Sequence, residues 1–137
     1  MAKVTFCGRY DRENIESFDV HILEDIILNE EPMGGAWGDA TIKYEDDEFT
    51  SQIIVLSDKS HGFYLNYSDE SEVTFLSLSD RSALEVVICP DDWEASLGLF
   101  LGRMSAFNAL FDFIKTGRRS QRIEWISEND MPEGSNW

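Results

Sequence analysis

Apolar positions recur with two different periods along the chain, and each period predicts its own kind of element. Within residues 17–29, Phe18, Ile22 and Ile26 recur at helical spacing, while acidic side chains fall largely on the opposite side. This spacing predicts an amphipathic helix. A loop is expected to follow at residues 31–38, which contain one proline and three glycines.

Alternation of apolar and polar residues predicts strands through the middle of the chain. Val4 and Phe6 mark a short first strand. Further strands are expected at residues 40–44, 53–56, 63–67, 73–76 and 84–88, and residues 97–101 offer one more. The intervening links at residues 45–49 and 58–62 are short and rich in turn residues, so neighbouring strands should pair as antiparallel hairpins.

A second amphipathic helix is expected near the C-terminus. Ser105 stands where an N-cap is wanted, and Phe107, Leu110, Phe111 and Ile114 follow at i, i+3, i+4 and i+7. Lys115 suits the last turn of this helix, and Gly117 can supply a left-handed C-cap. A basic loop at residues 118–122 and a strand at 123–125 should follow. The fold class predicted is α+β: an antiparallel meander of about five or six strands with two amphipathic helices packed on it.

The charge of the chain restricts the partners that it can bind. Its 137 residues carry 27 acidic and 11 basic side chains, a formal net charge of −16. A field of this sign repels phosphate backbones and anionic lipid headgroups, which argues against nucleic-acid and membrane partners. Residues 103–137 hold equal numbers of acidic and basic side chains, so the whole excess lies in residues 1–102. This acidic excess favours a basic protein partner, although a role in solubility alone would explain the excess equally well.

The N-terminus and the cysteines predict a reduced, cytoplasmic protein. Charged residues occupy the N-terminal stretch where a signal peptide needs an apolar core of about 7–15 residues. The longest apolar run, residues 97–101, is interrupted by Gly98 and is far shorter than the roughly 20 residues of a membrane-spanning helix. Cys7 and Cys89 lack the CxxC spacing of a redox or zinc motif.

No arrangement of residue types in the sequence predicts catalysis. The two histidines, His21 and His61, fall in a predicted helix and a predicted turn. Neither is spaced from a nucleophile and an acidic residue in a pattern typical of nucleophilic catalysis. The acidic clusters lack the EF-hand pattern, and the glycine-rich residues 34–38 lack the spacing of a phosphate-binding loop. We therefore expect no enzyme activity, no metal and no cofactor. A small hydrolase with a site not evident from the sequence is the alternative.

The C-terminal motif resembles a known family. Residues 105–117 read SAFNALFDFIKTG, followed by RRSQR at 118–122 and IEW at 123–125. This is similar to the signature of immunity-protein family one of bacterial polymorphic toxin systems: a Ser-capped helix ending in Phe-x-x-Thr-Gly, a short basic loop and an apolar-x-Trp strand. The family usually has a proline in the loop where this chain has Ser120.

The resemblance implies a non-catalytic immunity protein. Such a protein binds the toxic C-terminal domain of a cognate toxin, here expected to carry a basic active-site groove, and blocks its active or substrate-binding site. Residues 1–126 would form one immunity-type domain and residues 127–137 a flexible tail. The alternative is an acidic cytosolic adaptor unrelated to toxins.

Candidate partner-binding residues are aromatic anchors and acidic side chains in predicted loops. Trp93 could equally belong to the core, and Trp125 is expected to be structural, packing on Phe107, Phe111 or Ile114. The candidates are Trp37, Asp46, Asp47, Glu48, Tyr64, Asp69, Glu70, Glu72, Asp91, Asp92 and Trp93.

Overall fold

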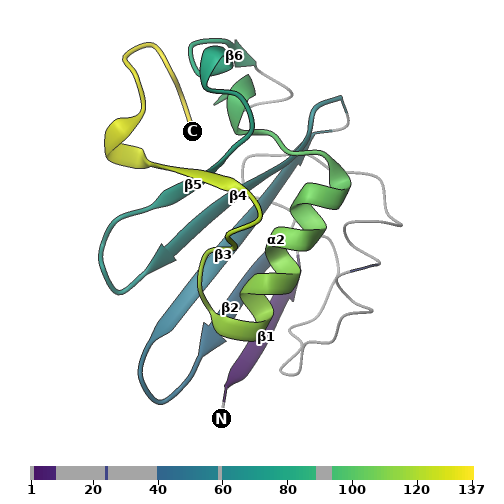
Figure 1. The fold of residues 1–137 in the computed structure, drawn as a ribbon, viewed down its shortest axis with the longest axis vertical. Coiled ribbons are helices and arrows are strands. Elements are labelled where there is room, and N and C mark those ends of the chain that lie inside the picture. The colour runs from purple at the N-terminus through teal and green to yellow at the C-terminus, as the bar shows by residue number, and fades with distance from the viewer. Residues whose placement is uncertain (1, 9–23, 25–39, 59, 89–93) are drawn as a thin grey trace.

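A six-stranded antiparallel sheet organises the part of the chain that the computed structural model describes, residues 2–8, 24, 40–58, 60–88 and 94–137 (Figure 1). Its strand order is β1-β2-β3-β4-β5-β8, so the first five strands lie side by side in sequence order. Their bounds are β1 Lys3–Gly8, β2 Ala40–Glu45, β3 Thr50–Asp58, β4 Gly62–Asp69, β5 Phe75–Leu78 and β8 Glu124–Ser127. The antiparallel meander predicted from the alternation is confirmed.

The remaining elements lie between β5 and β8 or after β8. A second, two-stranded sheet pairs β6 with β7. In this part of the chain the structure has η2 Arg81–Ala83, β6 Val87–Ile88, β7 Ala95–Ser96, η3 Leu97–Leu99, α2 Arg103–Thr116 and η4 Glu128–Asp130. No helix among the described residues is long and apolar enough to cross a membrane.

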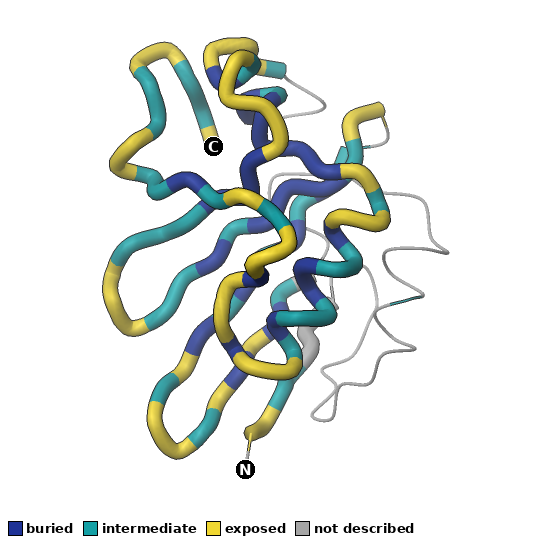
Figure 2. Tube along the Cα trace, in the orientation of Figure 1, coloured by how far each residue is buried: buried dark blue, intermediate teal, exposed yellow. Residues whose placement is uncertain are grey.

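The two faces of the sheet bury two separate cores, because successive side chains of a strand point to opposite faces. In β3 the buried positions alternate with half-buried ones (Figure 2). Ile53 and Val55 belong to the core that α2 covers. α2 adds Ala106, Leu110 and Phe113 to this first core. On the opposite face the second core contains Tyr64, Leu76, Leu78, Leu84, Ala95, Leu99, Phe100 and Ile126.

The C-terminal end of α2 is fastened to the sheet through Gly117. This residue has φ +73°, and its amide donates to Phe113 O at 2.7 Å, so the left-handed C-cap predicted there is confirmed. The carbonyl of Gly117 accepts hydrogen bonds from Ser51 Oγ at 2.6 Å and from Tyr67 OH at 3.1 Å. Both donors project from the sheet, so they fix where the helix ends.

The start of α2 corrects the prediction of a serine cap. The helix begins at Arg103 with Gly102 as N-cap, and no side chain caps it. Leu101 and Phe63 form a β-bridge immediately before it, with Leu101 N donating to Phe63 O at 2.6 Å. Because this bridge holds the chain against β4, the helix starts directly after it and Ser105 becomes an exposed residue of its first turn.

The elements predicted at residues 84–88 and 97–101 also differ from the structure. Only Val87–Ile88 forms a strand, and it belongs to the two-stranded sheet. Residues 97–99 form a 3-10 helix whose Gly98 carbonyl accepts from the amides of Ser79 and Asp80. Backbone turns that cover the second core therefore replace regular strands here.

Two further predictions fall on the two ends of the chain. The first amphipathic helix, residues 17–29, lies outside the described residues apart from Glu24. In the C-terminal tail, Ser96 N donates to Asn136 O at 2.8 Å and Asn136 N donates to Ser96 Oγ at 3.0 Å. The division into a domain and a flexible tail stays a prediction.

The basic loop after α2 is held by Asp112. Its carboxylate accepts from Ser120 Oγ at 2.6 Å and from Arg122 Nε and Nη2 at 2.9 and 2.8 Å. These hydrogen bonds, led by those of Arg122, lower the pKa of Asp112. Ser120 is buried, and its carbonyl accepts from Trp125 Nε1 at 2.9 Å. The Ser120 hydroxyl therefore makes a hydrogen bond to Asp112 that a proline side chain at this position could not make.

Trp125 packs against the first core, as do Phe107, Phe111 and Ile114, the residues expected beside it. Its ring centroid lies 6.2 Å from that of Tyr67 in an edge-on arrangement. Phe107 and Phe111 stack on each other at the border of the same core, with ring centroids 6.1 Å apart, and their contact with Trp125 stays a prediction. The half-buried indole thus links the basic loop to β4.

Replacing Gly117 with Ala should destabilise the fold by more than backbone strain alone. A left-handed conformation costs an L-residue roughly 1–2 kcal/mol, and a Cβ at Gly117 would lie 2.2 Å from Tyr44 Cδ1. Gly134→Ala is the matched control, because Gly134 has φ +88° and an added Cβ meets nothing within 4 Å. Denaturant unfolding should give a larger loss for Gly117→Ala; equal losses would contradict the packing role.

Substitution of Trp125 should separate its packing from its hydrogen bond. Trp125→Ala should cost stability toward the lower end of about 3–5 kcal/mol, because the indole is only half-buried. Trp125→Phe, which keeps a ring, should cost about 0.5–1.5 kcal/mol for the lost bond to Ser120. Thermal melts would test this against Trp137→Ala, since Trp137 is 47% exposed. A Trp125→Ala protein that melts like wild type would refute the structural role.

Candidate functional site

Two acidic turns predicted as separate loops lie side by side at one end of the sheet. β2 and β4 are both antiparallel to β3, so these two strands run in the same direction and finish at the same end of the sheet. The turn after β2 and the residues after β4 are joined by Thr50, whose amide and Oγ1 donate to Glu70 Oε1 at 3.0 and 3.2 Å. We call residues 45–48 and 69–72 the acidic end. It gathers six of the predicted residues: Asp46, Asp47, Glu48, Asp69, Glu70 and Glu72.

Two aspartates of the acidic end hold their own turns. Asp46 Oδ1 accepts from the amides of Glu48 and Phe49 at 2.8 and 2.9 Å, and Asp69 Oδ1 accepts from Ser71 N at 2.9 Å. A tyrosine two residues earlier reaches each aspartate: Tyr44 OH lies 3.2 Å from Asp46 Oδ2 and Tyr67 OH lies 3.1 Å from Asp69 Oδ2. The same Tyr-x-Asp arrangement therefore shapes both turns.

These contacts change the acidity of the groups involved. Hydrogen bonds from the Phe49 and Glu48 amides lower the pKa of Asp46. The pKa of Asp69 is lowered chiefly by its hydrogen bonds with Ser71. Burial, followed by the charge of Asp69, raises the pKa of Tyr67 to about 12. Both tyrosines thus remain neutral hydrogen-bond donors at neutral pH, and both aspartates remain charged.

Other carboxylates of the acidic end point outward. Glu45, Glu48 and Glu72 are exposed, and their side chains make no hydrogen bond or ion pair with any described residue. Glu72 has φ 67°, the one positive value for a described residue other than glycine. The acidic end is therefore divided: Asp46, Asp69 and Glu70 build it, and these three glutamates are available to a partner.

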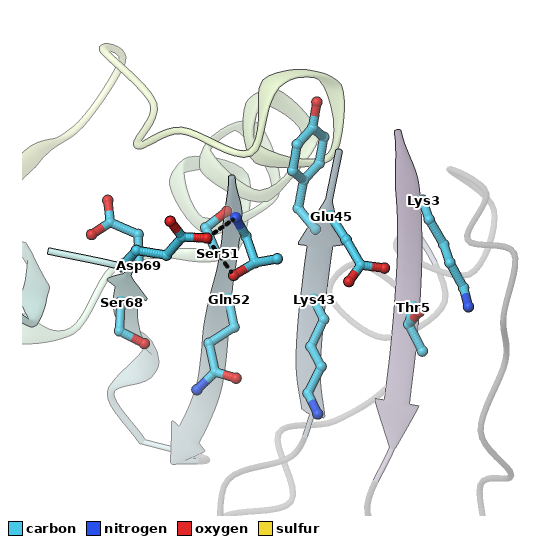
Figure 3. A pocket seen from close by; sticks show the side chains of 11 residues that line it. Lys3, Thr5, Lys43, Glu45, Ser51, Gln52, Ser68 and Asp69 are labelled. Carbon is cyan, nitrogen blue, oxygen red and sulfur yellow. Dashed lines mark hydrogen bonds between the residues drawn. The ribbon is translucent and has the colours of Figure 1, made fainter. Parts of the chain in front are cut away.

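A trough of ≈ 360 Å³ adjoins the acidic end (Figure 3). Its lining includes Lys3, Lys43, Gln52 and Ser68 on the side of the sheet opposite α2. A second hollow of ≈ 330 Å³ lies against the turn after β2. The two hollows share Lys3, Glu45, Thr50 and Glu70, so they form one continuous surface.

The side of the acidic end nearest α2 carries two arginines. The Arg118 guanidinium carbon lies 4.7 Å from the ring centroid of Phe49, and that of Arg119 lies 3.6 Å from the ring centroid of Phe75. Arg119 also contributes to the lowered pKa of Asp69. These positive charges border the carboxylates on the helix side, and Lys3 and Lys43 line the trough on the other side.

One predicted anchor is corrected by its burial. Tyr64 is 1% exposed and belongs to the second core, where its ring lies 5.9 Å from that of Phe100, so it is no surface anchor. Its position on β4 faces the segment that covers this core, which the alternation alone did not reveal. The candidates that lie outside the described residues are Trp37, Asp91, Asp92 and Trp93.

The structure adds residues that the sequence reasoning missed. Lys3, Lys43, Thr50 and Gln52 contribute to the same surface as the acidic turns. The repeated Tyr-x-Asp and the polar alternation of β2 and β3 could have pointed to this face. Among the described residues, no group of three or more histidine, cysteine or acidic side chains is arranged to hold a metal ion.

Comparison with known proteins adds no relative: no family model, curated protein or solved structure matches the chain.

The two aspartates should titrate independently of each other. Replacing Ser71 with Ala should raise the pKa of Asp69 and leave that of Asp46 low, since backbone amides hold Asp46. Because a lowered folded-state pKa stabilises the protein above the unfolded value of about 3.9, this stabilisation should disappear as the pH falls through the folded values. NMR titration of the carboxyl carbons would test this. An unchanged Asp69 pKa in Ser71→Ala, or a matching rise in Asp46, would count against the assignment.

Proposed function

We propose that this chain is an immunity protein, which binds a cognate bacterial toxin domain and neutralises it by blocking its active or substrate-binding site. The observation that carries the proposal is that two acidic turns lie side by side. They are held together by the hydrogen bonds between Thr50 and Glu70, which are 20 residues apart in sequence. A surface with several outward carboxylates suits a protein partner with a basic groove, and its field accelerates encounter. The resemblance of residues 105–125 to the immunity family supports the same function from different residues.

The proposal also covers where and how the protein acts, and the parts of the chain outside the described residues. The protein acts in the cytoplasm by binding alone, without catalysis, cofactor or metal. A second amphipathic helix at residues 17–29 packs with α2 on the sheet. Trp37, Asp91, Asp92 and Trp93 remain candidate contacts.

The C-terminal motif, residues 105–125, supports the proposal because it acts as a scaffold for the acidic end. Asp112, Ser120, Arg122 and Trp125 hold the basic loop through the hydrogen bonds described above. Gly117 fastens the same loop to β3 and β4, the strands that carry Thr50 and Asp69. The residues that resemble the family therefore position the acidic end.

Steering by the acidic end should appear in association kinetics. The partner to use is the C-terminal domain of a secreted protein encoded beside this chain's gene, first co-expressed and co-purified with it. Glu45→Gln/Glu48→Gln/Glu72→Gln should slow association at least about threefold and flatten its salt dependence, because exposed charges act mainly on the on-rate. Dissociation should change little.

The matched control removes the same charge elsewhere. Glu85, Glu124 and Glu133 are exposed and lie outside the acidic end, so Glu85→Gln/Glu124→Gln/Glu133→Gln changes the net charge equally. If both triple variants associate as fast as wild type, the acidity serves solubility alone, and if both are slowed equally, the net charge and not the acidic end steers the encounter. Stable binding to a partner other than a toxin would favour the adaptor.

A further inference from the structure

The basic loop after α2 carries three arginines, which differ in how their charge is used. Arg122 binds Asp112 through two hydrogen bonds, at 2.9 and 2.8 Å. Arg118 and Arg119 are exposed, and their guanidinium groups form no ion pair or hydrogen bond with any described residue. In a chain with 27 acidic side chains, these two cations keep their hydrogen-bond donors available to a partner.

A phenylalanine ring holds each of these two guanidinium groups in place. The guanidinium carbon of Arg118 lies 4.7 Å from the ring centroid of Phe49, and that of Arg119 lies 3.6 Å from the ring centroid of Phe75. Both distances are within the roughly 6 Å over which a cation is attracted to a ring face. Because the ring orders the side chain before a partner arrives, less conformational entropy is lost on binding.

The positions of the two rings place the arginines beside the acidic end. Phe49 lies in the turn after β2, where its amide donates to Asp46 Oδ1 at 2.9 Å. Phe75 begins β5, shortly after residues 69–72 of the acidic end. The arginine loop is itself fixed at its start, because the carbonyl of Gly117 is bonded to β3 and β4. The ordered arginines and the outward glutamates therefore border the same end of the sheet.

We propose that Arg118 and Arg119 each bind a carboxylate of the protein partner. The recognised surface would then be of mixed charge, with a basic groove opposite the outward glutamates and acidic side chains opposite the arginines. A guanidinium can donate two parallel hydrogen bonds to one carboxylate, which adds geometric specificity to charge attraction. A nucleic acid would offer phosphate oxygens to the same donors, but the net charge of −16 disfavours it.

This inference rests on the proposed function and adds a second feature to the partner that it names. The exposed glutamates act mainly on the rate of encounter, whereas ordered arginines inside the contact act mainly on dissociation. If the arginines only shielded the two rings from water, they would show no greater affinity for a carboxylate than an arginine elsewhere on the surface. The difference between these roles can be measured.

Acetate binding to the isotopically labelled full chain tests the arginines without a toxin. Sodium acetate replaces sodium chloride at constant ionic strength, and the arginine Nε–Hε signals are followed by NMR. Those of Arg118 and Arg119 should shift about threefold more per acetate added than that of Arg81, within the range of exposed ion pairs. Arg81 is an exposed residue of η2 that contacts no aromatic ring within the described chain. Equal shifts would overturn the proposal, as would binding of a DNA oligonucleotide at the same signals.

Removing one ring at a time tests whether the ring prepares the arginine. In Phe75→Leu the response of Arg119 to acetate should fall to that of Arg81, while Arg118 keeps its own response. Phe49→Leu should have the reverse effect. Because each variant leaves one arginine unchanged as an internal control, a general loss of folding would be seen at both. Responses that do not depend on the rings would count against the proposal.

Dissociation of the toxin domain then tests the role in the complex. Arg118→Gln and Arg119→Gln should each speed dissociation about tenfold, whereas Arg81→Gln, which removes the same charge, should change it less than about twofold. Arg119→Lys should still dissociate faster than wild type, because an ammonium group lacks the planar pair of donors.

The two assays separate failure of this inference from failure of the proposed function. A toxin domain that dissociates from wild type and from both arginine variants at the same rate would overturn the inference and leave the proposed function intact. If no toxin domain binds the chain while the acetate preference and its dependence on the rings hold, the proposed function fails and the carboxylate site stands.

Discussion

Hydrogen bonds to the carbonyl oxygen of Gly117 join the end of α2 to the sheet, and the rest of the structure depends on this connection. Ser51 and Tyr67 both donate to this one oxygen, so the last turn of α2, β3 and β4 meet at a single point. Both hydrogen bonds use one carbonyl oxygen, so they belong to one network whose members polarise one another. The single hydroxyl hydrogen of Tyr67 is shared between Gly117 O and Asp69 Oδ2, each 3.1 Å away, so the same group contacts the helix end and one of the acidic turns.

Sequence periodicity predicted the meander well because its strands are adjacent in the chain and half-buried. The alternation in β2 and β4 predicts their strands directly, whereas residues 53–56 of β3 are all apolar and only the fold shows that Ile53 and Val55 face α2. Gly117 signals the helix end through its freedom to adopt positive φ. The start of α2 was not predicted, since the bridge between Leu101 and Phe63 is a tertiary contact that overrides the local preference of Ser105 for a cap. The same holds for residues 84–88 and 94–101, where buried apolar residues such as Leu84 and Leu99 contribute to a second core without repeating at either period.

The candidate site was predicted in part, for an equally physical reason. Acidic side chains in turns are visible in the sequence, but their division into turn-forming and outward carboxylates depends on hydrogen bonds that only the fold places. Asp46 and Glu48 are two residues apart and similar in charge, yet one accepts two backbone amides and the other points away from the protein. The covering of Tyr64 is likewise a long-range effect, as its neighbour Phe100 lies far along the chain.

The strand order has a consequence for how the chain folds. β2, β3 and β4 pair through short hairpin turns, whereas β8 pairs with β5 across the long segment that contains α2, with Leu78 opposite Glu124. Closing a long loop costs more chain entropy than closing a hairpin, so local pairings precede distant ones. The acidic end lies on the early hairpins and the Asp112 loop lies beside the late strand. During synthesis the residues of these hairpins therefore become available for pairing before β8, whereas the core that stabilises the hairpins is completed only when α2 packs on them.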